Sequence, residues 1–404
     1  MESLENKSLW KNRNFVLLLS GQFVSWIGTE FSSITIPLIV LSITGSPQQA
    51  GMIAGARGLS YILLAIPAGA LIDRLDRRKA MIIANIGGGL ALGSIVVGLL
   101  LNKLTIPYLY AASLLEGGFF VFANLSRFAA VQQIVPKPQL GSALGKISVS
   151  DYISLLLGPA LGGILYQAVG ALLTILLDSI TYFINALSIF FINSSLKVQR
   201  EKPDHIYKEI HEGIKWLWNE KTIRFLSLLT SGSHIVASSL YLLIIIIARQ
   251  NHASPAMIGI ILGVGAGGGI LGSLIAEKIH NRLEFHSILR VTTTLSFLIF
   301  LLYFFTFNNF LLTLVTFLFN LVTPIYEITS STYSATVIPN EIRGRVTSLT
   351  RIAVLSAYSF GLFAMGTMLE KYGVNTSIAV FAGVLFILSI ITISNGSLKH
   401  VKPA

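Results

Sequence analysis

The chain has 404 residues, of which 53% are hydrophobic and only 12% are charged. About a quarter of the residues in soluble domains are charged, so this composition excludes an ordinary soluble enzyme or binding module and indicates a membrane protein. The sequence contains no cysteine, which excludes disulfide bonds and thiolate chemistry. The formal net charge of +11 is compatible with a nucleic-acid partner only if the basic residues cluster on one soluble surface.

Apolar runs long enough to cross a bilayer, about 20 residues each, follow one another along the whole chain. The first six predicted spans are 15–44, 47–72, 80–101, 105–133, 141–169 and 171–195. The second six are 222–249, 254–278, 286–306, 309–337, 343–371 and 374–396. We therefore predict an all-α membrane protein with twelve transmembrane helices.

Lysine and arginine residues are distributed unevenly over the predicted loops. With a cytoplasmic N-terminus, 23 of the 29 lie in or beside cytoplasmic segments, three lie in external loops, and Arg57, Arg127 and Arg351 fall inside spans. Because cytoplasmic loops are enriched in positive charge, we expect both termini in the cytoplasm. The basic balance then reflects topology and contact with anionic lipids, and we expect no nucleic-acid partner.

One long connection, residues 196–221, separates the two sets of spans. Its apolar residues recur at helical spacing, which predicts an amphipathic helix on the inner membrane surface: Ile206, Ile210, Ile214, Leu217 and Trp218. A plain linker and a regulatory element are equally good interpretations of its role. We expect a six-helix bundle over 1–195, this linker, and a second six-helix bundle over 222–404.

The two halves repeat each other. Asp73-Arg74-Leu75-Asp76 reappears 208 positions later as Asn281-Arg282-Leu283-Glu284. At an offset of 203, three glycines of the first half meet three of the second, namely Gly158, Gly163 and Gly170 with Gly361, Gly366 and Gly373. Two bundles with the same orientation are parallel repeats, which predicts pseudo-symmetry and a cavity shared near the midplane.

These motifs resemble the major facilitator superfamily over essentially the whole chain. The loop signature between helices two and three is matched by Gly69, Asp73, Arg74, Arg77 and Arg78, with Asp76 where the family usually has glycine. The fifth span carries Gly158, Pro159, Gly162 and Gly163, similar to the family's antiporter motif. The openings Gly21-Gln22 and Thr44-Gly45-Ser46 resemble the branch of macrolide efflux pumps and enterobactin-type siderophore exporters.

The resemblance implies a secondary transporter, not an enzyme, working by alternating access. It implies proton-coupled export of amphipathic or aromatic small molecules, such as macrolides or siderophores, by a cofactor-free monomer in a bacterial cell membrane. Its partners would be the substrate, protons and lipids. A lipid or lysolipid flippase of the same fold remains an alternative, and a receptor or a membrane-embedded enzyme is a weaker one.

The two motifs have structural interpretations beside the functional ones. The charged hairpin could serve positive-inside topology alone, whereas the resemblance favours a gate latch in which Asp73 caps a helix or pairs with arginine and Arg77 and Arg78 anchor at lipid headgroups. The small residues of the fifth span favour close helix packing over ligand contact.

Charged residues inside spans are costly unless they are paired or hydrated. Arg127 and Asp151 lie at similar depth, as do Glu327 and Arg351, so each half offers one predicted ion pair. These pairs could fix helix register or bind protons or substrate.

Glu30 and Glu116 have no cation at their own depth in the sequence pattern. A carboxylate of this kind can bind and release a proton. Glu30 is therefore the first candidate for proton coupling, followed by Glu116, Glu327 and Asp151. We expect less of Asp178, near the outer end of its span, and attribute Arg57 to snorkelling.

Aromatic and polar side chains on the expected cavity helices favour a large amphipathic solute. The candidates are Trp26, Phe119, Phe122, His234, Tyr241 and Tyr326. Such side chains also face lipid or fill cores, and a hydrogen-bonded structural role is the commoner one for a histidine. The sequence shows neither a phosphate-binding loop nor a cluster with metal-ligand spacing.

Overall fold

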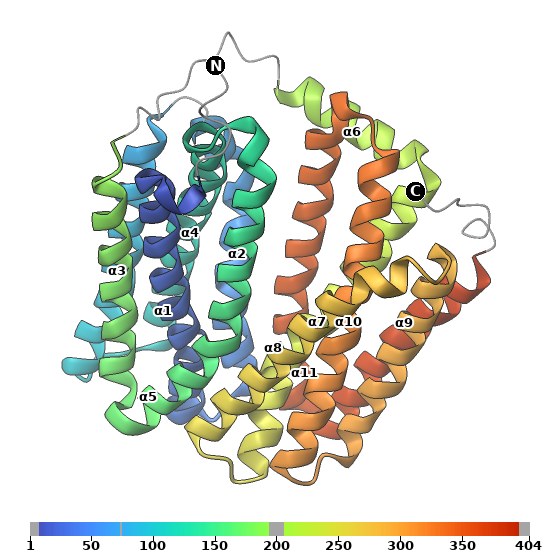
Figure 1. Ribbon diagram of the computed structural model, residues 1–404. Helices are drawn as coiled ribbons and strands as arrows, with labels where there is room; N and C mark the ends of the chain where they lie inside the picture. Colours follow the sequence, from blue (N-terminus) through green and yellow to red (C-terminus); the bar gives the residue numbers. More distant parts are fainter. Residues whose placement is uncertain (1–7, 73–74, 194–205, 396–404) are drawn as a thin grey trace. The chain divides into compact units, whose positions relative to one another are not determined.

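A computed structural model describes residues 8–72, 75–193 and 206–395, and these residues are helical throughout apart from short connections (Figure 1). The helices of the first half are α1 Arg13–Thr44, α2 Pro47–Ile72, α3 Arg77–Leu100, α4 Ile106–Ile134 and α5 Leu140–Phe190. Those that follow are α6 Ile206–Asn219, α7 Lys221–Gln250, α8 Pro255–His280, α9 Phe285–Leu301, α10 Asn309–Val337 and α11 Asn340–Ser394. Three short 3₁₀ turns are η1 Leu9–Lys11, η2 Lys137–Gln139 and η3 Leu302–Phe305.

The two longest helices are each broken by one glycine. Gly170 in α5 has φ 77° and Gly373 in α11 has φ 76°, so each continuous run is two helices joined at a sharp bend. Within the described residues, nine helices are long and apolar enough to span a membrane, with α5 and α11 counted once each. Counting both limbs of α5 and α11 and adding α2 gives the twelve long helices that the sequence predicted.

The helices form two compact units. The first comprises Met1–Thr44 and Ala56–Glu201, and the second comprises Gly45–Gly55 and Lys202–Ala404. The sequence expectation placed all of α2 in the first bundle, whereas its first turns pack with the second. There the Glu370 carboxylate accepts the Ser46 hydroxyl and, at 3.0 Å, the backbone N–H of Gln48. A carboxylate from α11 thus caps the first turn of α2.

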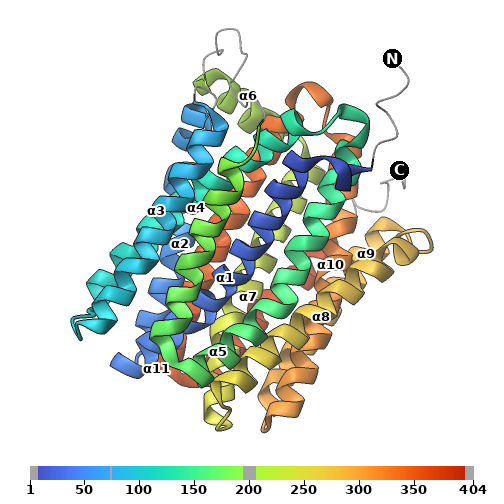
Figure 2. The same cartoon turned by 60° about the vertical axis from the view of Figure 1, so that its left-hand side comes forward.

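In the first unit α1 lies along α5, and α3 packs against both α4 and α5 (Figure 2). Glycines set these close approaches. A Cβ on Gly162 would come within 2.9 Å of the Cα of Phe31, and one on Gly158 would overlap the side chain of Glu30. The packing interpretation of the fifth-span motif therefore has direct support, since these glycines let α5 approach α1.

In the second unit α7 packs on α11 and α8 packs on α10. Gly268 and Gly272 of α8 face the backbone carbonyls of Phe317 and Leu321, where a Cβ would collide. This stripe of small residues brings the backbones of α8 and α10 together.

The predicted linker helix is present as α6, but its apolar residues do not share one environment. Leu217 packs against the buried cluster around Ile223, whereas Ile214 and Trp218 are exposed. The side chains of Ile206 and Ile210 lie outside the described residues. The Glu212 carboxylate, 2.5 Å from Arg345 Nη1, ties α6 to α11.

We expect Gly170→Ala to destabilise the protein by about 1–3 kcal/mol, because its φ and ψ of 77° and 175° belong to a region that only glycine adopts readily. Thermal unfolding in detergent, followed by size-exclusion chromatography, measures the effect. Gly145→Ala is the matched control on the same helix, since a Cβ there meets nothing within 4 Å. Equal midpoints for the two variants would show that the bend tolerates a side chain.

Candidate functional site

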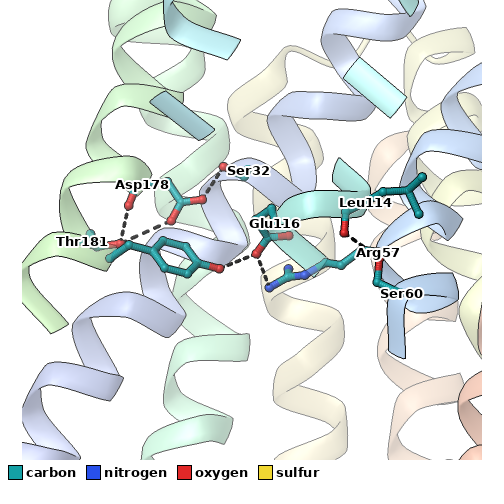
Figure 3. A network of polar contacts seen from close by, with 8 residues as sticks. Ser32, Arg57, Ser60, Leu114, Glu116, Asp178 and Thr181 are labelled. Atoms are coloured by element: carbon teal, nitrogen blue, oxygen red, sulfur yellow. Dashed lines mark hydrogen bonds and ion pairs between the residues drawn. The ribbon is translucent and has the colours of Figure 1, made fainter. Parts of the chain in front are cut away.

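The first unit gathers charged and hydroxyl side chains from four helices. Arg57 Nη2 on α2 lies 2.9 Å from Glu116 Oε1 on α4, and that oxygen also accepts the hydroxyl of Tyr182 from α5. Asp178, on the same limb of α5, accepts the hydroxyl of Ser32 from α1 (Figure 3). We call Glu30, Arg57, Glu116 and Asp178 the carboxylate cluster.

Asp178 is 1% exposed, so its carboxylate is cut off from solvent. Besides Ser32, the hydroxyl of Thr181 lies 3.3 Å from Asp178 Oδ1 (Figure 3). Both partners are neutral donors, which satisfy the oxygen atoms without cancelling a charge. Gly28 on α1 faces Thr181 and Asp178, and a Cβ there would overlap both side chains.

Glu30 is half-buried on α1 and receives the Ser33 hydroxyl at 3.0 Å from Oε2. It also interacts electrostatically with Arg57, as does Asp178. The single guanidinium of the cluster therefore acts on three carboxylates, although it contacts Glu116 directly.

Arg57 can lie beside Glu116 because the residue after Glu116 is a glycine. A Cβ on Gly117 would come within 2.8 Å of the Cα of Arg57, so only glycine lets α4 approach α2 at this level. Three residues after Arg57, the hydroxyl of Ser60 donates to the carbonyl of Leu114 at 2.7 Å and fixes the same contact (Figure 3).

One expectation about this region was wrong. Glu116 was expected to lack a cation, and Arg57 was attributed to snorkelling, yet the two form an ion pair. Asp178 is buried in the cluster, and its expected place near the outer end of its span stays a prediction. Tyr182 was not singled out. Tyr182 follows Asp178 by four residues, so the two share one face of a helix, and this spacing could have predicted that Tyr182 joins the site.

Aromatic rings extend from the carboxylate cluster. The guanidinium of Arg57 lies 4.3 Å from the ring centre of Phe120, which lies 6.0 Å from the ring centre of Trp26. Arg127 lies 5.6 Å from the ring centre of Trp26. Of the predicted cavity residues in this unit, Trp26 belongs to this series, whereas Phe119 packs against Gly87 of α3.

The structure brings Arg127 and Asp151 together. Arg127 is 4% exposed, its Nη1 lies 3.5 Å from Asp151 Oδ1, and its Nη2 donates to Asn124 at 3.2 Å. The predicted contact is therefore present, and its role in transport stays a prediction. Phe122, on the same helix α4, is half-buried.

The second unit has a cavity between α7, α9, α10 and the second limb of α11. Glu327 Oε1 lies 3.4 Å from His234 Nε2, and the hydroxyl of Tyr326 lies 2.7 Å from that of Thr230. Its lining combines hydroxyl and apolar groups, including Ser233, Thr292, Thr293, Ser296, Thr323 and Leu388.

Two of the predicted residues in this unit are not among the residues that line this cavity. Tyr241 is half-buried further along α7, and Arg351 is exposed on α11. The contact that the structure gives the Glu327 carboxylate is with the His234 ring. The pairing of Glu327 with Arg351 stays a prediction.

The hairpin between α2 and α3 is described in part, since Asp73 and Arg74 lie outside the described residues. Asp76 caps α3, accepting the backbone N–H of Arg78 at 2.9 Å. This is the position at which the loop signature usually has glycine. Arg77 donates to the carbonyl of Ala129 at 3.0 Å, and Arg78 donates to that of Phe190. These arginines thus bind carbonyl groups near helix ends, and their contact with lipid headgroups stays a prediction. Gly69 has open space around it.

No group of three or more histidine, aspartate or glutamate side chains that could hold a metal ion occurs in the part of the chain that the structure describes.

We expect Arg57→Met to cost about 3–5 kcal/mol of stability, because it leaves the buried Glu116 carboxylate without its cation. The double variant Arg57→Met/Glu116→Gln removes both charges and should recover part of that loss. Thermal midpoints in detergent measure both, with Lys103→Met, in an exposed loop, as the control. A double variant less stable than the single one would contradict a charge-pair origin.

Known transporters resemble the chain in sequence. The chain is 23% identical to the multidrug efflux pump Tap of Mycobacterium tuberculosis (strain H37Rv) over 273 residues, which is 64% of each chain, so the match spans less than two thirds of that relative. It is 23% identical to the enterobactin exporter EntS of Citrobacter koseri over 296 residues, covering 73% of this chain and 71% of the relative.

Solved structures show the same fold. The nucleoside transporter NupG matches with a TM-score of 0.76 and 12% identity, over 96% of this chain and 100% of that one. A bacterial homologue of the iron transporter ferroportin matches with a TM-score of 0.75 and 17% identity, over 98% and 100%. The family model described as Major Facilitator Superfamily matches residues 18–361 and 225–398. The chain therefore belongs to the major facilitator superfamily and is a multi-pass membrane transporter.

Proposed function

We propose that this transporter exports amphipathic or aromatic small molecules, such as drugs or siderophores, in exchange for protons. The observation that carries the proposal is the charge balance of the carboxylate cluster, in which one arginine acts on three carboxylates. The names of the relatives, a multidrug efflux pump and an enterobactin exporter, support the substrate class and the direction.

The charge balance favours bound protons. Arg57 neutralises Glu116 at 2.9 Å, which leaves Glu30 and Asp178 with hydroxyl partners only among their described hydrogen bonds. Ionised carboxylates inside a membrane cost several kcal/mol unless they are paired or hydrated. Protonation removes that cost, and ionisation becomes favourable when water or a cationic group of a substrate reaches the cluster.

The aromatic series supports a substrate surface beside these proposed proton sites. Trp26 is four residues before Glu30, so the two lie on one face of α1. Rings at Trp26 and Phe120 offer broad apolar contacts, and the arginines against them favour aromatic solutes. A bound substrate and a proton on Glu30 would then compete for adjoining positions, which is what exchange requires.

The hairpin arginines fit a role in conformational change. Arg77 ties the start of α3 to the carbonyl of Ala129 near the end of α4. A transporter must remake such contacts as its cytoplasmic side opens and closes, so their strength sets the rate. We propose that Gly69, Asp73, Arg74, Arg77 and Arg78 together act as this latch.

The direct test is counterflow in proteoliposomes. The substrate panel contains macrolides, catecholate siderophores and lysolipids, and each is measured with and without an imposed pH gradient. The proposal expects exchange of a macrolide or siderophore that the pH gradient accelerates. Exchange of lysolipids alone would favour a flippase, and exchange that ignores the pH gradient would remove proton coupling.

We expect Glu30→Gln to abolish uphill transport and its pH dependence while substrate exchange continues, because glutamine mimics the protonated acid. Accumulation against a gradient and counterflow, measured on the same liposomes, separate the two effects. Glu277→Gln, at an exposed site on α8, is the control. A Glu30→Gln protein that still concentrates substrate would move coupling to Glu116 or Glu327, which would then be tested in that order.

Arg77→Ala should lower the turnover number several-fold with normal expression and thermal stability, because it loosens a contact that is remade in each cycle. Initial rates at saturating substrate measure it, and Lys79→Ala, an exposed neighbour, is the control. Wild-type turnover in the arginine variant would leave this hairpin with a role in topology alone.

A further inference from the structure

The hydrogen bonds of His234 fix which ring nitrogen carries a proton. Its Nδ1 lies 3.0 Å from the backbone carbonyl of Thr230. A carbonyl oxygen can only accept, so Nδ1 must carry a hydrogen. In the neutral ring Nε2 is then a bare acceptor, and it is this atom that faces Glu327.

Two acceptors cannot face each other without a proton. If the ring is neutral and Glu327 is ionised, the Nε2 lone pair meets Oε1 at 3.4 Å, which is repulsive. One proton resolves the conflict, either on Nε2, giving imidazolium and carboxylate, or on Oε1, giving imidazole and carboxylic acid. Both forms of the pair carry zero net charge.

The described residues that line the cavity supply no charge besides this pair. Among the described residues that line this cavity, α7 contributes Ser233 and His234, α9 contributes hydroxyls, and the second limb of α11 contributes leucines. The titratable groups are thus His234, Glu327 and Tyr326, and the Tyr326 hydroxyl is bound to that of Thr230. The cavity of about 20 Å³ has room for a water molecule beside the pair, and Glu327 is 41% exposed, so protons can reach it.

We propose that His234 and Glu327 form a proton-binding dyad, which holds one proton between Nε2 and Oε1 and is a site distinct from the carboxylate cluster. The proton moves from Nε2 to Oε1 as the imidazolium becomes the Nδ1–H imidazole and the carboxylate becomes the acid. Release of the proton leaves a net negative charge at the cavity. A role of this dyad in coupling rests on the proposed function, whereas its protonation does not.

The test reads both partners directly, in full-length protein reconstituted into lipid nanodiscs without substrate. Nitrogen-15 NMR of labelled histidine gives the state of the His234 ring, assigned by the signal lost in His234→Gln. Infrared spectroscopy gives the protonated fraction of Glu327, assigned by the carboxylic-acid band lost in Glu327→Gln. At neutral pH the imidazolium fraction and the acid fraction should sum to about one, with all neutral ring as Nδ1–H.

Glu327→Gln should leave the ring neutral, since the glutamine amide can donate to Nε2. Glu284→Gln is the matched control, because Glu284 is 74% exposed and lies 3.3 Å from His286, so it should leave the signals of His234 and Glu327 unchanged. A neutral ring that carries its proton on Nε2 and none on Nδ1 in the wild type, or fractions that sum to near zero, would overturn the dyad.

A second arm measures the coupling role in proteoliposomes. If the wild type exchanges substrate for protons, Glu327→Gln should lower the number of protons moved per substrate by one. An unchanged ratio would confine the dyad to a structural role. A wild type that moves no substrate would refute the proposed function, while the spectroscopic result would still decide the dyad.

Discussion

The constraint on which the site depends is that a carboxylate inside a membrane must be neutralised. In the first unit Arg57 provides one positive charge, which is committed to Glu116 at 2.9 Å, while Asp178 and Glu30 receive hydroxyl groups. In the second unit the His234 imidazole plays the corresponding part for Glu327. The two solutions differ in kind, because a guanidinium keeps its proton at any physiological pH, whereas an imidazole can give its proton up.

Small residues make these contacts possible. Gly117 brings the Arg57 backbone against α4, Gly28 gives room to Asp178, and Gly158 gives room to Glu30. Each is a place where a methyl group would push a charged side chain away from its partner. The antiporter-like motif on α5 therefore acts through packing, because its glycines bring α5 close to the helix that carries Glu30.

The fold could be read from the sequence because its determinants are local. Apolar runs, basic loops and the glycine repeat predicted twelve helices, and even the bends fell at Gly170 and Gly373, where the runs were divided. The site could be read only in part. Arg127 and Asp151 were matched by depth alone, whereas Arg57 and Glu116 were not, because helix rotation and glycine-controlled spacing decide which side chains meet. The sequence does not indicate which ring nitrogen of His234 faces a carbonyl and which faces Glu327. The dyad can therefore be inferred only from the three-dimensional structure.

The cap on α2 has a consequence for how the protein is assembled. Gln48 and Ser46 are made early, and the Glu370 carboxylate that holds their turn is separated from Gln48 by 322 positions. A Cβ on Gly51 would also come within 3.1 Å of Gly366, so the same turns need α11 for packing. During synthesis this end of α2 must therefore wait for the Glu370 contact until nearly the whole chain has entered the membrane, and until then its local cap is the Ser46 hydroxyl, which accepts the backbone N–H of Gln49 at 3.1 Å. Insertion of α11 is then the step that closes the second unit, and truncations that stop before Glu370 should leave a segment from the start of the chain without its partner.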